Sequence, residues 1–120
     1  MKIAIATNSL GKSVAGHDIA TKLMTACSHG FDGIELAFEC LEFHAESEQF
    51  ARNGTRESRL RAAASDIHRR ASGLSLDIVA LNPFGAYDGL VDEGEVVSRL
   101  EEGELWLQLC QILQAPILQV

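Results

Sequence analysis

The sequence has no long apolar run. A membrane-spanning helix needs roughly 18 consecutive apolar residues, and no stretch of the 120-residue chain approaches that length, which excludes an integral membrane protein. At the N-terminus, MKIAIATNSLGKS places only Lys2 before a short apolar stretch. That stretch is too short for the apolar part of a signal peptide and is better interpreted as a first β-strand. The length suffices for one domain with a modest core.

An excess of basic residues is also missing. Ten basic residues stand against seventeen acidic ones, for a net charge of −7. A protein that neutralises nucleic-acid phosphates normally shows the opposite sign or a basic stripe. The most basic segment, RESRLRAAASDIHRR, spreads its charges around a predicted helix. Nucleic-acid binding is therefore not expected.

Cysteines are few, and their number is odd. Cys27, Cys40 and Cys110 show no CxxC spacing, so neither a disulfide framework nor a zinc site is expected. All three have apolar neighbours in the sequence. We therefore interpret them as small hydrophobic residues of a protein in a reducing compartment, which predicts a cytoplasmic location.

The common short catalytic motifs are absent as well. There is no GxGxxG, HExxH or GxSxG, and no spacing that predicts metal ligands. The GKS at residues 11–13 is similar to the end of a phosphate-binding loop, but Ala6 stands where that loop requires glycine. The residues by themselves thus indicate a soluble α/β domain with a polar face, and no particular reaction.

The chain does contain short apolar runs that alternate with segments whose apolar residues have the spacing of an α-helix. The runs at residues 2–7, 33–38, 76–82 and 115–120 are typical of parallel strands covered on both faces. Between them we predict helices over residues 18–30, 55–72 and 92–113, with Asp18 as an N-cap and a capping box from Asp92 to Glu95. The order βαβαβαβ predicts an α/β fold with a parallel sheet. Residues 39–54 form the longest irregular stretch and are a candidate lid.

Polar side chains gather where the predicted strands end, which is the binding side of parallel α/β folds. They are Asn8 and Ser9, Glu35 to Glu39, Asn82 to Tyr87, and Gln119. Glu35 is the strongest candidate, because a carboxylate in a buried strand either binds substrate hydroxyls or bonds to a neighbouring strand. Both alternatives remain open at this point. His17 and His44 are interpreted as loop residues.

Three segments resemble one enzyme family. SLGKSVAGHDIATKL, GFDGIELAFECLEF and LNPFGAYDGL, in this order and spacing, are similar to landmarks of the fungal-type 3-dehydroshikimate dehydratases of quinate breakdown. These enzymes belong to the sugar phosphate isomerase/epimerase group of xylose isomerase-like (β/α)8 TIM barrels. The resemblance spans essentially the whole chain. It departs from the family at Ala86, where a polar or aromatic residue is usual, and at Gly103, which interrupts the third predicted helix.

The resemblance implies a lyase that dehydrates 3-dehydroshikimate to protocatechuate with a divalent metal such as Mg, Mn or Co. It implies that Glu35, Phe84 and Tyr87 line the substrate side, with the two rings flanking the flat six-membered ring of the substrate. The family's metal ligands come from later strands, so no metal ligand and no catalytic residue is assigned to this chain.

The length of the chain predicts how much of such a barrel it can form. A complete (β/α)8 barrel takes about 250 residues, so residues 1–120 are expected to form its N-terminal half, with four strands and three helices. We expect this half to be inactive alone and to need a C-terminal half-barrel or a second copy. Two alternatives remain open: a sugar isomerase or epimerase of the same superfamily, and a non-catalytic half-barrel that self-associates.

Overall fold

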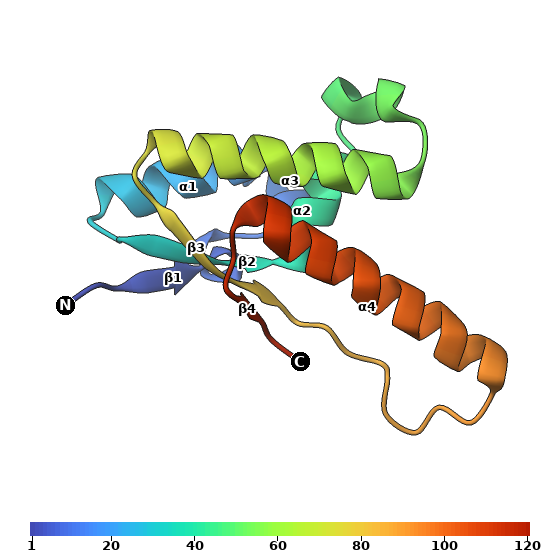
Figure 1. The fold of residues 1–120 in the computed structure, drawn as a ribbon. Coiled ribbons are helices and arrows are strands. Elements are labelled where there is room, and N and C mark those ends of the chain that lie inside the picture. Colours follow the sequence, from blue (N-terminus) through green and yellow to red (C-terminus); the bar gives the residue numbers. More distant parts are fainter.

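The computed structural model describes all 120 residues and contains one parallel β-sheet. Its strands are β1 (Ala4–Ala6), β2 (Gly33–Ala37), β3 (Asp77–Asn82) and β4 (Ile117–Leu118). They are hydrogen-bonded in the order β1-β2-β3-β4, and every pair is parallel. The predicted parallel α/β fold is confirmed, and β1 and β4 are the two edges of the sheet (Figure 1).

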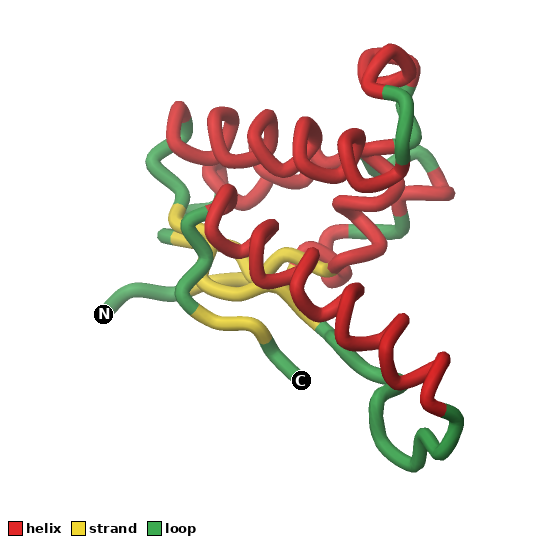
Figure 2. The backbone as a smooth tube through the Cα atoms, turned by 45° about the vertical axis from the view of Figure 1, so that its right-hand side comes forward, coloured by secondary structure: helices red, strands yellow, loops and turns green.

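The helices all lie on one face of this sheet. They are α1 (Ile19–Ser28), α2 (Phe38–Ala45), α3 (Arg56–Gly73) and α4 (Glu93–Leu113). Three short 3-10 helices accompany them, at Thr7–Leu10, Ser13–Ala15 and Glu48–Asn53. Figures 1 and 2 show that no element covers the opposite face, which would point into the interior of a closed barrel.

The predicted helix starts are confirmed by side-chain caps. The Asp18 carboxylate accepts a hydrogen bond from the Thr21 N–H at 2.8 Å. At the start of α4, Asp92 accepts one from the Glu95 N–H at 3.0 Å. Such caps satisfy N–H groups that have no partner within the helix. Because they depend on residues three apart in the chain, they were readable from the sequence.

The expectation that residues 39–54 are irregular is wrong. The strand ends at Ala37, α2 begins directly at Phe38, and a 3-10 helix follows at Glu48–Asn53. The chain therefore has four α-helices rather than three. Phe38, Leu41 and Ala45 are all buried, and their spacing of three and four places them on one helical face. The predicted last strand is also too long, since only Ile117–Leu118 pair with β3.

A single hydrophobic core lies between the helices and the sheet. This core is one continuous cluster of 25 buried residues, and it joins all four helices to the sheet. On β2, Ile34 and Leu36 are fully buried within this core. Because side chains alternate along a strand, Glu35 between them points to the opposite, uncovered face, where it is half-buried. None of the helices combines the length and the apolar character that a membrane span requires.

Candidate functional site

The candidate site is built around Glu35 on the uncovered face of the sheet. The Asn82 side-chain amide donates a hydrogen bond to Glu35 Oε1. The two residues belong to neighbouring strands, and a register shift between Ile34 and Glu35 sets Glu35 opposite Ala80 and Ala37 opposite Asn82. Asn82 is the last residue of β3. The pair therefore lies at the carboxyl end of the sheet, where parallel α/β folds bind ligands.

This geometry combines the two roles that the sequence left open for Glu35. Its carboxylate does bond to a neighbouring strand, through Oε1. Its other oxygen, Oε2, makes no hydrogen bond within the chain and remains available to a hydroxyl donor. An ionised carboxylate has about four lone-pair sites, so one bond from Asn82 leaves capacity for a ligand.

Phe84 and Tyr87 lie together and pack against α4. Their rings are stacked, with centroids 5.9 Å apart and an interplanar angle of 6°. Phe84 also packs edge-to-face on Trp106, at 5.2 Å between centroids, and the Arg99 guanidinium lies 4.3 Å from the Phe84 centroid. The two rings line an apolar groove of about 540 Å³ between α4 and the β4 edge. Glu35 is on β2, with β3 in between.

The residues of this chain do not supply a divalent metal site. No three His, Cys, Asp or Glu side chains come close enough together to hold a metal ion. At Glu35 the only polar partner is the Asn82 amide, which turns its N–H rather than its oxygen toward the carboxylate. A hard divalent cation requires several oxygen ligands. These residues by themselves therefore do not provide the oxygen ligands that such a cation needs.

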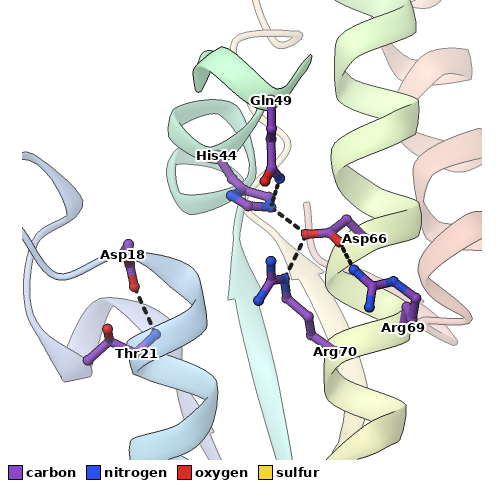
Figure 3. A network of polar contacts seen from close by, with 7 residues as sticks. All are labelled: Asp18, Thr21, His44, Gln49, Asp66, Arg69 and Arg70. Atoms are coloured by element: carbon purple, nitrogen blue, oxygen red, sulfur yellow. Dashed lines mark hydrogen bonds and ion pairs between the residues drawn. The ribbon is translucent and has the colours of Figure 1, made fainter.

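His44 belongs to a polar network on the helical side of the molecule, shown in Figure 3. Its prediction as a loop residue is wrong, since it lies in the last turn of α2. His44 Nε2 is 2.8 Å from Asp66 Oδ2, and Arg70 and Arg69 also bond to the Asp66 carboxylate. Burial alone would raise the pKa of Asp66, but these bonds outweigh it and hold the pKa below its ordinary value. His17, as predicted, lies outside any helix or strand.

Sequence reasoning missed a buried polar cluster beneath the segment that follows β1. Lys22 of α1 is 1% exposed, and its Nζ lies 3.2 Å from Cys40 Sγ and 3.2 Å from Ser13 Oγ. Thr7 Oγ1 donates to the same sulfur at 3.3 Å. All three cysteines are free, and the expectation of purely apolar surroundings is wrong for Cys40. Lys22 stands three residues after Ile19, on the apolar stripe of α1, and that position was the available signal.

Comparisons with known proteins bear directly on the resemblance. The 3-dehydroshikimate dehydratase of Neurospora crassa is 38% identical to this chain over 122 residues, which cover 99% of this chain and 34% of the dehydratase. The resemblance to the fungal-type 3-dehydroshikimate dehydratases is confirmed. The chain thus spans about a third of the length of the relative that it matches. No protein-family profile matches the chain.

A solved structure supports the fold independently. A xylose isomerase-like TIM barrel/4-hydroxyphenylpyruvate dioxygenase fusion protein superposes with a TM-score of 0.71 and 22% sequence identity. The match covers 98% of this chain and 16% of the fusion protein. Together with the parallel strand order, this match shows a fold like part of a TIM-type (β/α)8 barrel, with four consecutive strands in one sheet.

Proposed function

We propose that residues 1–120 act as the N-terminal half of the barrel of a 3-dehydroshikimate dehydratase. The reaction is the loss of water from 3-dehydroshikimate to give protocatechuate. The observation that carries the proposal is the 38% identity with the Neurospora crassa dehydratase across 99% of this chain. The Glu35–Asn82 pair at the carboxyl end of β2 and β3 adds a suitable polar group on the barrel-facing side of the sheet.

Glu35 is proposed to bind substrate hydroxyls. Its free oxygen accepts a hydrogen bond from a hydroxyl on the ring, while the Asn82 amide holds the carboxylate in place. A positioned carboxylate is also a group that takes up or delivers a proton in a dehydration. The substrate of the proposed reaction carries two hydroxyl groups on a six-membered ring, which suits one carboxylate better than an extended apolar pocket.

Phe84 and Tyr87 are proposed to contribute a flat surface. Phe84 is held between Trp106 and Arg99, and it orients the Tyr87 ring through stacking. Tyr87 is 48% exposed and so offers one ring face to a six-membered ring. Flat rings pack well in offset stacked arrangements. Because the two rings pack against α4, whereas Glu35 points to the uncovered face of the sheet, they are proposed to contact the outer part of the substrate or a segment that covers it.

A divalent metal, such as Mg, Mn or Co, is proposed to take part in the complete enzyme, with ligands from polypeptide outside these 120 residues. Both sheet edges, β1 and β4, present unpaired backbone groups, and one face of the sheet is uncovered. We propose that the 120-residue chain is inactive alone. A complementary half-barrel, or less favourably a second copy, would close the barrel.

A chimera tests this function. The segment of the Neurospora crassa dehydratase that aligns with this chain is replaced by residues 1–120, and the product is assayed for protocatechuate formation with and without added Mg, Mn or Co. We expect metal-dependent dehydration by the chimera and none by the 120-residue chain. The unmodified dehydratase serves as the positive control.

Two other results would overturn the proposal. A folded chimera that interconverts ketoses but leaves 3-dehydroshikimate unchanged would indicate a sugar isomerase or epimerase. A 120-residue chain that forms a stable, folded oligomer, together with a folded but inactive chimera, would indicate a self-associating half-barrel without catalysis. Sedimentation of the 120-residue chain measures its oligomeric state.

A further inference from the structure

The cluster around Lys22 and Cys40 is a second site of possible chemistry, separate from Glu35. Cys40 lies in the first turn of α2, directly after β2, and Thr7 directly follows β1. Thr7 Oγ1 accepts the Ala37 N–H at 3.0 Å and donates to Cys40 Sγ at 3.3 Å. The cluster therefore sits at the carboxyl end of the sheet, where it joins α1, α2 and the segment after β1.

Lys22 is the unusual member, because its side chain is buried without a carboxylate partner. It is 1% exposed, and none of the chain's ion pairs involves it. Its two contacts are the Ser13 hydroxyl and the Cys40 sulfur, each at 3.2 Å. A buried amino group is costly unless it is paired or hydrogen-bonded. Cys40 therefore supplies one of only two partners that keep this lysine in the core.

The other two cysteines lack this arrangement. Cys27 Sγ approaches only the Leu74 carbonyl, at 3.6 Å. Burial raises the pKa of the Cys110 thiol, which makes that residue less reactive. Thiol chemistry depends on the groups around the sulfur, and a neighbouring lysine is among those that promote it. Of the three cysteines, only Cys40 has an amine within bonding reach.

We propose that Cys40 and Lys22 form a reversible covalent cross-link in the presence of dioxygen, in which one oxygen atom bridges the sulfur and the nitrogen. This inference does not depend on the proposed dehydratase function. A bridge through oxygen fits the observed 3.2 Å separation better than a direct sulfur–nitrogen bond. The direct bond would require the two atoms to move closer together within a packed core, which resists such movement.

The reaction balances with dioxygen as the oxidant. The Lys22 ammonium first gives one proton to water. The neutral amine then loses one hydrogen, the thiol loses its own, and the O–O bond breaks. One oxygen atom forms the N–O and O–S bonds, and the other leaves with the two hydrogens as water. Sulfur and nitrogen together lose four electrons, which dioxygen takes up. Four thiol equivalents reverse the reaction, giving water and two disulfides.

The cross-link would tie α1 to α2 beneath the segment that follows β1. Ser13 and Thr7 are held by the same cluster, so their segment is fixed when Lys22 and Cys40 are joined. A bond between residues 22 and 40 also closes a loop in the unfolded chain, and such closure stabilises the folded state. Oxidised protein should therefore melt at a higher temperature than reduced protein.

Intact mass measurement of the purified 120-residue chain tests the proposal. The chain is incubated in oxygen-saturated buffer, and a matched sample is kept anaerobic with dithiothreitol. We expect a gain of one oxygen atom and a loss of two hydrogen atoms, reversed by dithiothreitol. Peptide mapping should join the peptides that contain Lys22 and Cys40, and tryptic cleavage after Lys22 should be lost. Tm should rise by several degrees and return on reduction.

Variants of the cysteines and of Lys22 show which residues form the cross-link. The double variant Cys27→Ser, Cys110→Ser retains both cross-linking partners and should show the same mass change. Cys40→Ser and Lys22→Met should abolish it. Should Lys22→Met fail to fold, the double variant and the peptide map decide alone. Oxygenation that adds oxygen to Cys40 without joining Lys22, or an unchanged mass with a free Cys40 thiol, would overturn the proposal.

Discussion

Gly103 faces the end of the Phe84 ring. A Cβ atom built at residue 103 would lie 3.4 Å from Phe84 Cζ, and the next ring atoms would be 3.9 and 4.0 Å away. The helix thus passes close to the ring, but with enough room for one methyl group. Gly103 lies within α4, eleven positions after its N-cap Asp92. The interruption that the sequence shows in this helix is therefore not required by a backbone conformation that only glycine adopts.

Replacing Gly103 with alanine should stabilise the protein. Glycine in a helix interior is about 1 kcal/mol less favourable than alanine, and the added methyl meets Phe84 at an ordinary contact distance. We expect the free energy of unfolding to rise by up to about 1 kcal/mol. Urea unfolding followed by the fluorescence of Trp106, the single tryptophan and a 5% exposed residue, measures the change.

Gly94→Ala is the matched control in the same helix. A Cβ at residue 94 would lie 3.0 Å from Asp92 Oδ2, the oxygen that caps the helix, so the substitution should bring no comparable gain. Equal stabilisation by both variants would show that helix propensity alone, and not the contact with Phe84 or Asp92, determines the change in the free energy of unfolding. A loss of stability in Gly103→Ala would show that the Phe84 ring cannot tolerate the methyl group.

Because of Asp66, the free energy of unfolding should decrease as the pH falls into the acidic range. Its pKa in the folded protein is lower than its ordinary value of 3.8, because bonds from Arg70, His44 and Arg69 outweigh the effect of burial. A group with a depressed folded-state pKa stabilises the fold above its unfolded pKa, and that contribution is lost as the pH falls through the folded value. The loss should begin below about pH 5 and continue into strong acid.

The variant Asp66→Asn isolates this contribution, because an amide does not titrate. At pH 7 it should be less stable than the wild type by about 1–3 kcal/mol, the usual cost of weakening charged hydrogen bonds in a partly buried site. The difference should narrow steadily as both proteins are unfolded in urea at decreasing pH. A difference that stays constant from pH 7 to strong acid would contradict the assignment to Asp66.

The cap at Asp92 should support the start of α4. Asp92→Ala removes the acceptor for the Glu95 N–H and should cost about 1 kcal/mol. Asp92→Ser retains a capping oxygen and should cost much less. Both values come from urea unfolding under the same conditions. Equal losses in the two variants would show that the charge of Asp92, rather than its hydrogen bond, supports the helix.

Glu35 should matter for turnover in the chimeric dehydratase. Glu35→Gln preserves shape and can still bond to Asn82, but it removes the charge that binds and exchanges protons with hydroxyl groups. We expect kcat/KM to fall at least about tenfold, equivalent to about 1.4 kcal/mol of transition-state stabilisation, with little change in Tm. Asp77→Asn, at the opposite end of β3, is the control and should leave turnover unchanged. Unchanged turnover in Glu35→Gln would leave Glu35 a structural residue.

The features of the fold that the sequence predicted correctly depend on residues close to one another in the chain. Caps at Asp18 and Asp92 depend on neighbours three residues away, and the parallel order follows from the alternation of strands and helices. The position of Glu35 on the other face from Ile34 follows from strand periodicity. For α2 this reasoning failed, because the helix has only eight residues and its apolar face is short. The packing of Phe38 against Trp106, which lies far along the chain, favours this helix.

The sequence by itself thus determined the sheet, the principal helix starts and the resemblance to the dehydratases. The tertiary structure alone decided which polar groups meet. Asn82 reaches Glu35 because β2 and β3 pair side by side with a register shift next to Glu35, and Lys22 reaches Cys40 because α1 packs beside α2. These partners are 47 and 18 positions apart in the chain. No local periodicity encodes such distances, so only the packing of the whole core brings these side chains into contact.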